Sequence, residues 1–302
     1  MREQFIDWKP RGETAAVVQQ AVAICEEYAG MGYGLTLRQL YYQFVARGII
    51  PNNMQSYKRL GSIVDKARLA GLLDWRYIED RTRNVYRTDG ADTSPEDAVR
   101  STAGGYRREL WADQPNHVEV WVEKEALAGV VQQAASEVGV HYFACRGYVS
   151  QSEMYSSGKR FGRLRRYEGK RVTVLHLGDH DPSGIDMTRD IQERLSMFAG
   201  GWVTVERIAL NMDQVEQWDP PPNPAKQTDA RFIEYQALYG DDSWELDALP
   251  PDTLHNLIVD RVKEERDEDL WAEAEARQER ERAQLQRVSD QWDDVLSLVE
   301  GD

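Results

Sequence analysis

Two stretches of the chain place an apolar strand pattern directly before an amphipathic helix pattern, and this order constrains the fold more than any other feature. In residues 117–139, alternate valines mark one face of a strand, and a helical pattern follows. Residues 170–198 repeat the order with an apolar run, a sharp loop and a helix, and residues 201–210 add another strand. Strands that alternate with helices predict a mainly parallel, buried sheet, and therefore an α/β fold.

The N-terminal part has a different pattern, with three predicted helices. The first covers residues 12–30, the second starts at Thr36, and the third covers about 56–70. Thr36 and Gln39 fit a capping box, in which the two side chains satisfy backbone N–H groups at a helix start. Residues 72–83 then alternate like a strand or hairpin. Three helices and a β-wing predict a winged helix whose third helix contacts DNA through Lys58, Arg59, Lys66 and Arg68.

These patterns divide the chain into four segments. Residues 1–88 form the predicted winged-helix domain. Residues 89–105 are polar and rich in Gly, Ser, Thr and Asp, a composition that predicts a linker. Residues 106–250 form the strand-and-helix domain. Residues 251–302 form an acidic helical segment that either packs on the body of the protein or pairs with a second copy.

The charge distribution favours a polyanionic partner although the net charge is −15. Residues 260–302 carry 15 acidic and 7 basic side chains, which accounts for more than half of the excess. Residues 31–87 carry 10 basic against 4 acidic side chains, and a second basic run covers 159–171. Two such patches are what contact with a phosphate backbone requires, whereas the alternative is two solvated charged faces. Further candidate DNA contacts are Arg81, Arg83, Lys159, Arg160 and Arg163.

The sequence gives no sign of a membrane or export segment. No run of 18 apolar residues is present, and the first 30 residues lack a signal-peptide pattern, so we expect a cytoplasmic protein associated with the nucleoid. Cys25 and Cys145 form no CxxC pair and are expected to be reduced core residues. The Gly-Lys pair within residues 156–161 lacks the spacing of a P-loop.

The second predicted helix carries a candidate nucleophile. Its apolar stripe includes Leu40, Tyr41 and Phe44, so Tyr41 is expected in the core. Tyr42 lies about 100° further round the helix, one turn beyond Arg38, and is expected to be exposed. A tyrosine hydroxyl beside a fixed guanidinium has the groups needed to attack a phosphodiester. The alternative is an ordinary surface Tyr–Arg stack.

Three acidic residues follow predicted strands. Glu123 comes after the first strand, and Asp179 and Asp181 come after the second. Ligands bind outside the carboxyl ends of parallel strands, and carboxylates suit Mg²⁺, with Mn²⁺ as a substitute. The loop also partly matches an EF-hand, but Asp190 stands where a glutamate belongs. An aspartyl-phosphate site and plain solvated acids are the remaining alternatives.

Taken in order, LRQLYY, VEKEAL and LGDHDPSG make the chain resemble the A subunit of topoisomerase VI and its meiotic double-strand-break relatives. The resemblance covers about residues 30–250. In that family an arginine precedes a nucleophilic tyrosine by four positions, which matches Arg38 and Tyr42. The second domain resembles a Toprim domain, whose glutamate and DxD pattern matches Glu123, Asp179 and Asp181.

The resemblance implies Mg²⁺-dependent transesterification on double-stranded DNA, which leaves a 5′-phosphotyrosyl link. It also implies a homodimer in which the tyrosine of one protomer works beside the metal site of the other, and a separate ATPase B subunit as partner. Gln39 replaces the family's aspartate, and the segment that joins the B subunit is short. A compact chain of this kind would suit a phage or mobile element. A hydrolytic Toprim nuclease, in which Tyr42 only binds DNA, and a non-catalytic DNA-binding relative remain as alternatives.

Overall fold

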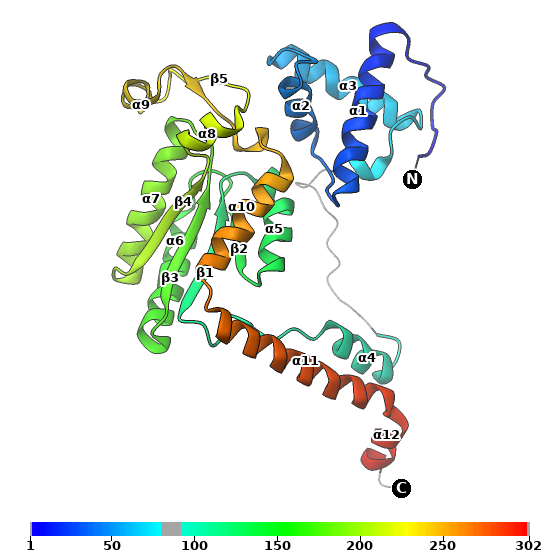
Figure 1. Ribbon diagram of the computed structural model, residues 1–302, viewed down its shortest axis with the longest axis vertical. Helices are drawn as coiled ribbons and strands as arrows, with labels where there is room; N and C mark the ends of the chain where they lie inside the picture. Colours follow the sequence, from blue (N-terminus) through cyan, green and yellow to red (C-terminus); the bar gives the residue numbers. More distant parts are fainter. Residues whose placement is uncertain (1, 80–91, 301–302) are drawn as a thin grey trace. The chain divides into compact units, whose positions relative to one another are not determined.

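The computed structural model describes residues 2–79 and 92–300, and the chain divides into two compact units (Figure 1). The larger unit comprises residues 1–84 and 118–264. The smaller unit comprises residues 85–117 and 265–302. Each unit is described by itself below.

Three helices form the N-terminal part of the larger unit: α1 (Gly12–Gly30), α2 (Leu37–Ala46) and α3 (Met54–Leu69). All three helices expected from the sequence are present. The capping box is also confirmed, because the Thr36 N–H donates to Gln39 Oε1 at 2.9 Å and the Gln39 N–H donates to Thr36 Oγ1 at 3.2 Å. Two N–H groups at the start of α2 are thereby satisfied, which fixes where this helix begins.

The hairpin predicted after the third helix differs from what the structure shows. Trp75–Tyr77 form a short 3₁₀ helix (η1), and Ile78 makes an isolated parallel bridge with Leu35. The rest of the predicted wing, with Arg81 and Arg83, lies outside the described residues. The winged helix therefore stays a prediction.

The sheet of the larger unit has four parallel strands in the order β2-β1-β3-β4. Their bounds are β1 (Asn116–Val122), β2 (His141–Ala144), β3 (Arg171–Leu177) and β4 (Val203–Ala209). The predicted α/β class is confirmed. Strand β2 was not expected from the sequence, because it is only four residues long and partly exposed, and so shows no clear alternation.

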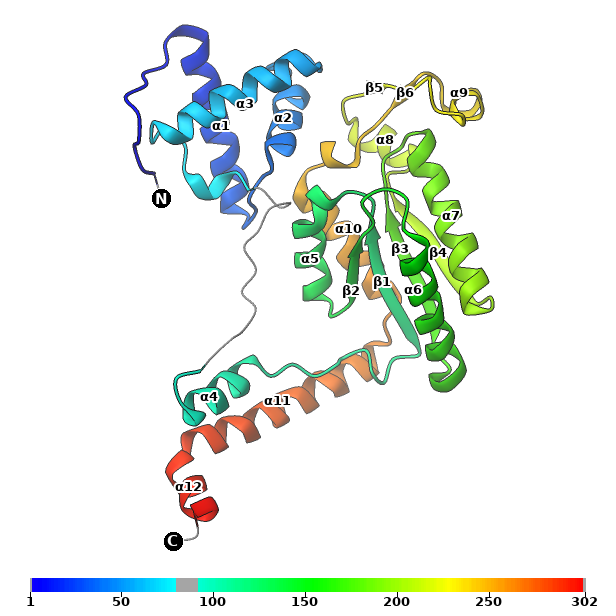
Figure 2. The ribbon, with the colours of Figure 1, turned by 180° about the vertical axis from the view of Figure 1, so that it is seen from behind.

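Helices cover both faces of this sheet (Figures 1 and 2). On one face, α5 (Ala128–Glu137) packs against α10 (Pro251–Glu264). On the other, α6 (Gln151–Arg163) packs against α7 (Pro182–Ala199). The remaining elements of the larger unit are short: η2 (Glu125–Leu127), η3 (Leu164–Glu168), α8 (Met212–Trp218), β5 (Asn223–Pro224), α9 (Phe232–Tyr239), β6 (Asp242–Ser243) and η4 (Leu246–Ala248).

The segment predicted as a linker contains a helix of the smaller unit, α4 (Pro95–Gly105). Ser94 caps this helix by accepting the Asp97 N–H at 3.1 Å, and proline follows at the first helical position. A serine cap, an N-terminal proline and acidic residues in the first turn all favour a helix start. The polar composition suggested a linker because these start signals consist of polar residues and proline.

The acidic C-terminal segment contributes to both units. Helix α10 belongs to the larger unit, whereas α11 (Glu268–Asp290) and α12 (Trp292–Glu300) belong to the smaller one. Within the smaller unit, α11 packs against α4, and Trp271 meets Trp111 edge to face at 5.9 Å. Within residues 2–79 and 92–300, none of the helices has the length and apolar character needed to cross a bilayer.

Two glycines allow α6 and α7 to approach closely. A Cβ atom on Gly158 would lie 2.5 Å from Phe198 Cβ, and one on Gly162 would lie 3.0 Å from the Ala199 carbonyl oxygen. The Gly-Lys pair that lacks P-loop spacing therefore has a packing role, because its glycine lies where two helices touch.

We expect Gly158→Ala to destabilise the larger unit by about 1–3 kcal/mol, because the added methyl group overpacks the α6–α7 contact. Gly104→Ala in α4 is the matched control. A Cβ there meets nothing within 4 Å, and alanine favours a helix over glycine by about 1 kcal/mol. Denaturant unfolding measures both variants. An unchanged free energy of unfolding for Gly158→Ala would contradict the close contact.

Candidate active site

Strands β1 and β3 are neighbours, and their carboxyl ends bring two of the predicted acids together. The Asp179 N–H donates to Glu123 Oε2 at 2.9 Å, and the Glu123 N–H donates to the Leu177 carbonyl at 2.8 Å. The connections from β1 and β3 lead to opposite edges of the sheet, to β2 and β4 respectively. This is the topological switch point at which open α/β sheets bind ligands.

Asp179 lies at the centre of a buried polar cluster. Its Oδ1 atom accepts the Leu246 N–H at 2.8 Å and pairs with Lys124 Nζ, also at 2.8 Å. Asp181 has a different role, because it caps α7 by accepting the Gly184 N–H at 2.6 Å. A Cβ on Gly184 would lie 2.3 Å from the Asp179 carbonyl oxygen, so this tight turn requires glycine.

The pKa values of both strand-end acids are shifted upward. Burial raises the pKa of Glu123, and the nearby Asp181 adds to the effect. Burial also raises the pKa of Asp179 well above its ordinary value, although Lys124 acts in the opposite direction. Two buried carboxylates this close together favour proton or cation binding.

Arg207, in β4, supports the loop that carries the aspartates. Its buried guanidinium donates to the carbonyl oxygens of Gly178 at 3.0 Å, Asp179 at 2.5 Å and Leu210 at 3.1 Å. Burial lowers the pKa of Arg207, opposed by the nearby acids. The sequence analysis missed this residue. The available signal was an arginine in a strand whose other positions are mostly apolar, directly after Glu206.

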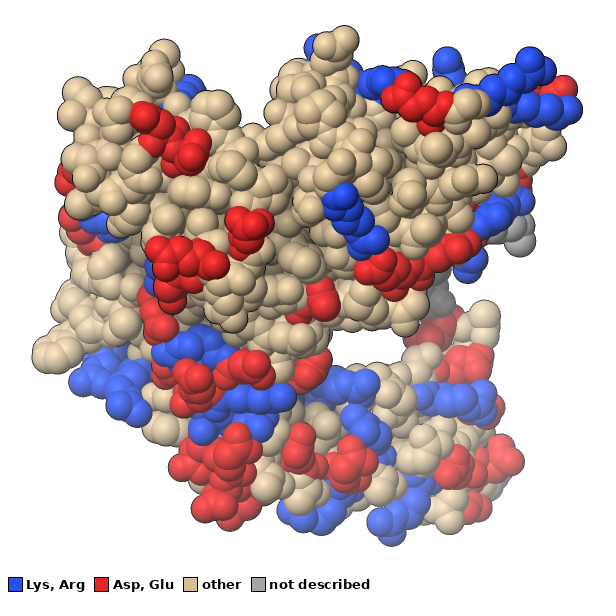
Figure 3. Space-filling view, turned by 45° about the horizontal axis from the view of Figure 1, so that its top comes forward, with Lys and Arg blue, Asp and Glu red and all other residues tan. Residues whose placement is uncertain are grey.

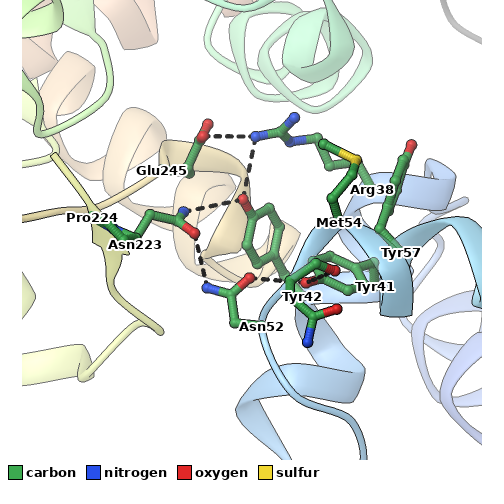
Figure 4. A pocket seen from close by; sticks show the side chains of 10 residues that line it. Arg38, Tyr41, Tyr42, Asn52, Met54, Tyr57, Asn223, Pro224 and Glu245 are labelled. Carbon is green, nitrogen blue, oxygen red and sulfur yellow. Dashed lines mark hydrogen bonds and ion pairs between the residues drawn. The ribbon is translucent and has the colours of Figure 1, made fainter. Parts of the chain in front are cut away.

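Tyr42 is buried, contrary to the expected exposed position, with 3% of its surface accessible. The reason is that residues far along the chain pack over α2 (Figure 4). Tyr42 Oη accepts hydrogen bonds from Arg38 Nη2 at 3.2 Å and from Asn223 Nδ2 at 3.5 Å. Burial raises the pKa of Tyr42 to about 12, with a further contribution from Glu245 and an opposing one from Arg38. Tyr41 is buried, as expected.

Two acids that the sequence analysis missed connect Tyr42 with the strand ends. Arg38 pairs with Glu245 at 2.7 Å and with Asp247 at 2.8 Å. Lys124 pairs with the same two carboxylates, and its distance to Asp247 Oδ1 is 3.0 Å. A continuous polar network therefore runs within one chain from Tyr42 through Arg38, the shared acids and Lys124 to Asp179. The sequence signal was the ELD triplet of residues 245–247 beside a predicted domain boundary.

Two cavities lie along this network. One of about 380 Å³ lies beside Tyr42, and its wall includes the rings of Tyr41 and Tyr57 (Figure 4). The other, of about 540 Å³, is lined by Glu123, Lys124 and Asp247. Arg38 and Glu245 line both cavities. A cavity of a few hundred Å³ is typical of a ligand site.

The predicted acids offer carboxylate oxygens, the ligand type that Mg²⁺ prefers, but Glu123, Asp179 and Asp181 are not among the described groups that bring three ligand atoms within 4.8 Å of one another. The raised pKa values of Glu123 and Asp179 result mainly from burial, which disfavours their charged form, and a nearby cation would offset this effect. Among the described residues, one group that could hold a metal ion lies near the start of β1: His117, Glu119 and His141 place one ligand atom each within 4.8 Å of one another. This group is not specific to Mg²⁺, because imidazole ligands suit transition metals.

The predicted DNA contacts have different environments. Lys58, Arg59 and Lys66 are exposed on α3, although Arg59 pairs with Glu13 at 3.1 Å. Arg68 is half-buried, donates to the carbonyl oxygens of Trp75 and Ile78, and has a structural role.

In the second basic run, Arg160 pairs with the buried Glu119, so it holds α6 to β1. Lys159 and Arg163 are exposed. Figure 3 shows the described basic and acidic side chains interspersed over the visible face.

Comparison of the chain with protein-family models and with curated proteins finds no match. The family resemblance therefore stays a prediction from the motifs.

We expect Asp179→Asn to stabilise the metal-free protein at neutral pH, because the folded state holds the pKa of Asp179 above its ordinary value of 3.8. Each pKa unit corresponds to about 1.4 kcal/mol of stability. The gain should be largest above the folded pKa and should vanish below pH 3.8, where Asp179 is protonated in both states. Denaturant unfolding in EDTA across this pH range measures the difference in the free energy of unfolding between Asp179→Asn and the parent protein.

Asp186→Asn is the control, and its expected effect on stability is opposite to that of Asp179→Asn. Burial acts to raise the pKa of Asp186, but Tyr148 and Arg189 lower it below its ordinary value. Asp186→Asn should therefore lose stability at neutral pH. Equal and destabilising effects of both substitutions would contradict the upward shift of the Asp179 pKa.

Proposed function

We propose that this chain is a DNA-cleaving transesterase similar to the topoisomerase VI A subunit, with Tyr42 as nucleophile. The observation that carries the proposal is the polar network from Tyr42 Oη through Arg38, Glu245 and Lys124 to Asp179. It joins a hydroxyl, two cations and a cluster of carboxylates, which are the groups that phosphodiester transesterification uses.

In the proposed step, Tyr42 Oη forms a bond to phosphorus and the bond from phosphorus to the 3′ oxygen breaks. The phenol loses its proton and the 3′ oxygen gains one, so the step is balanced and leaves a 5′-phosphotyrosyl end. Arg38 already donates to Tyr42 Oη at 3.2 Å, and this bond favours the phenolate. Even with this bond the pKa of Tyr42 is about 12 before substrate binds, so the proposed step needs further stabilisation of the phenolate beyond Arg38.

Glu123 and Asp179, with Asp181 beside them, are the proposed ligands of a divalent cation. A bound Mg²⁺ would stabilise negative charge on phosphate oxygens. Lys124 and Arg38 balance the charge of the shared acids and hold the cluster in place. Since the network lies within one chain, the proposal does not require a tyrosine from a second protomer. A homodimer and an ATPase B-type partner remain parts of the family expectation.

The test is incubation with supercoiled plasmid and Mg²⁺ or Mn²⁺, stopped with SDS and analysed with and without protease. We expect breaks linked to protein, which are lost in Tyr42→Phe because the nucleophilic oxygen is missing. Tyr41→Phe is the matched control. It also removes a buried hydroxyl from α2, the one that donates to Asn52 Oδ1 at 2.9 Å, and it should keep the covalent product.

Asp179→Asn should also abolish cleavage. Free-ended breaks that survive Tyr42→Phe but not Asp179→Asn would establish the hydrolytic nuclease instead. DNA binding without breaks of either kind would favour the non-catalytic alternative.

A further inference from the structure

Exposed aromatic and basic side chains gather at the end of the sheet opposite the Tyr42 network. Strands β3 and β4 begin at this end, and α6 and η3 end there (Figure 2). Seven residues of β3 separate it from the aspartate loop, a distance of about 23 Å. We call this surface the aromatic–basic strip, and it consists of Tyr155, Lys159, Arg163, Arg165, Tyr167 and Trp202.

The aromatic rings of the strip point into solvent. The exposed fractions are 51% for Tyr155, 76% for Tyr167 and 75% for Trp202. Large apolar rings are usually buried or half-buried, so three exposed rings on the adjoining segments α6 and η3 and directly before β4 indicate an interaction site. Tyr155 and Lys159 are also one helical turn apart on the exposed side of α6.

The backbone before β4 holds Trp202 outward. Trp202 has φ 70°, and it follows Gly200 at φ 81° and Gly201 at φ 85°. A bulky residue in this left-handed region is strained, and such strain is typical of functional sites. Most of the Trp202 surface is exposed, so burial of its ring does not compensate for this backbone strain.

A second irregular segment presents the neighbouring side chains. Residues Leu164–Glu168 form a π-helix that ends at Gly169, where φ is 71°. Short π-helical segments are frequent at functional sites. This segment brings the Arg165 guanidinium over the Trp202 ring, at 5.4 Å from the ring centre. Lys159 lies in the same way over Tyr155, at 5.6 Å.

The strip is basic although the chain as a whole is acidic. Lys159, Arg163 and Arg165 are exposed on it, and the neighbouring Glu168 lies 4.0 Å from Lys170. Cations interleaved with exposed rings are the pattern of surfaces that bind unpaired nucleic acid, where bases stack on the rings and phosphates meet the cations. In a duplex the base faces are already stacked on one another, so exposed rings add little to the affinity for duplex DNA.

We propose that the aromatic–basic strip binds an unpaired DNA strand, with a base stacked on Trp202 and phosphates beside Arg165 and Lys159. The inference is independent of the proposed cleavage, because it concerns a surface at the other end of the sheet and needs no metal.

The test is fluorescence anisotropy with a labelled 12-nucleotide thymidine strand and a 12-base-pair duplex, in EDTA so that no cleavage contributes. Trp202→Gly is the main variant. Glycine accepts the left-handed backbone, so folding should be kept or improved while the ring is lost. We expect the affinity for the single strand to fall by about 5- to 100-fold, as for removal of one stacked base. Trp202→Phe should keep most of the affinity.

Ile233→Ala is the control, because Ile233 is an equally exposed apolar residue of the larger unit outside the strip. It should leave binding unchanged. The proposal is overturned if Trp202→Gly, with an unchanged melting temperature, binds the single strand within twofold of the parent protein. It is also overturned if the duplex and the single strand lose affinity equally, because the Trp202 ring would then not distinguish an unpaired strand from a duplex.

Discussion

Two acidic side chains, Glu245 and Asp247, hold the larger unit together by sharing two cations from distant parts of the chain. Arg38 comes from α2 and Lys124 follows β1, and each pairs with both carboxylates. Asp247 is almost fully buried, so loss of both cations would leave a charge with little solvation, at a cost of about 3–5 kcal/mol. The approach of Tyr42 to the strand-end acids therefore depends on these ion pairs.

Features that arise from neighbouring residues could be predicted from the sequence. The start of α2 depends on Thr36 and Gln39, three positions apart, and the structure has both hydrogen bonds. The alternating valines of β1 and the apolar run of β3 gave the α/β class. The carboxyl ends of these strands then placed Glu123 and Asp179 at one edge, where the structure brings them together.

Features that depend on tertiary contacts could not be predicted in this way. Helical periodicity placed Tyr42 off the apolar stripe, and it could not reveal that Asn223, 181 positions later, covers it. Glu245 precedes and Asp247 lies within the three-residue helix η4, and nothing in the local sequence distinguishes them from solvated acidic side chains. Arg207 is recognisable only once the Asp179 loop lies beside it.

The burial of Tyr42 determines how a substrate could reach it. Beside the tyrosine, Asn52 Nδ2 donates to the Pro222 carbonyl and to Asn223 Oδ1, each at 2.9 Å. Neutral hydrogen bonds of this kind contribute about 0.5–1.5 kcal/mol each, which is much less than a buried ion pair costs to break. The hydrogen bonds of Asn52 should therefore break more easily than the ion pairs of Arg38. If it opens while Arg38 stays paired with Asp247, Tyr42 becomes accessible and keeps its position relative to the acids.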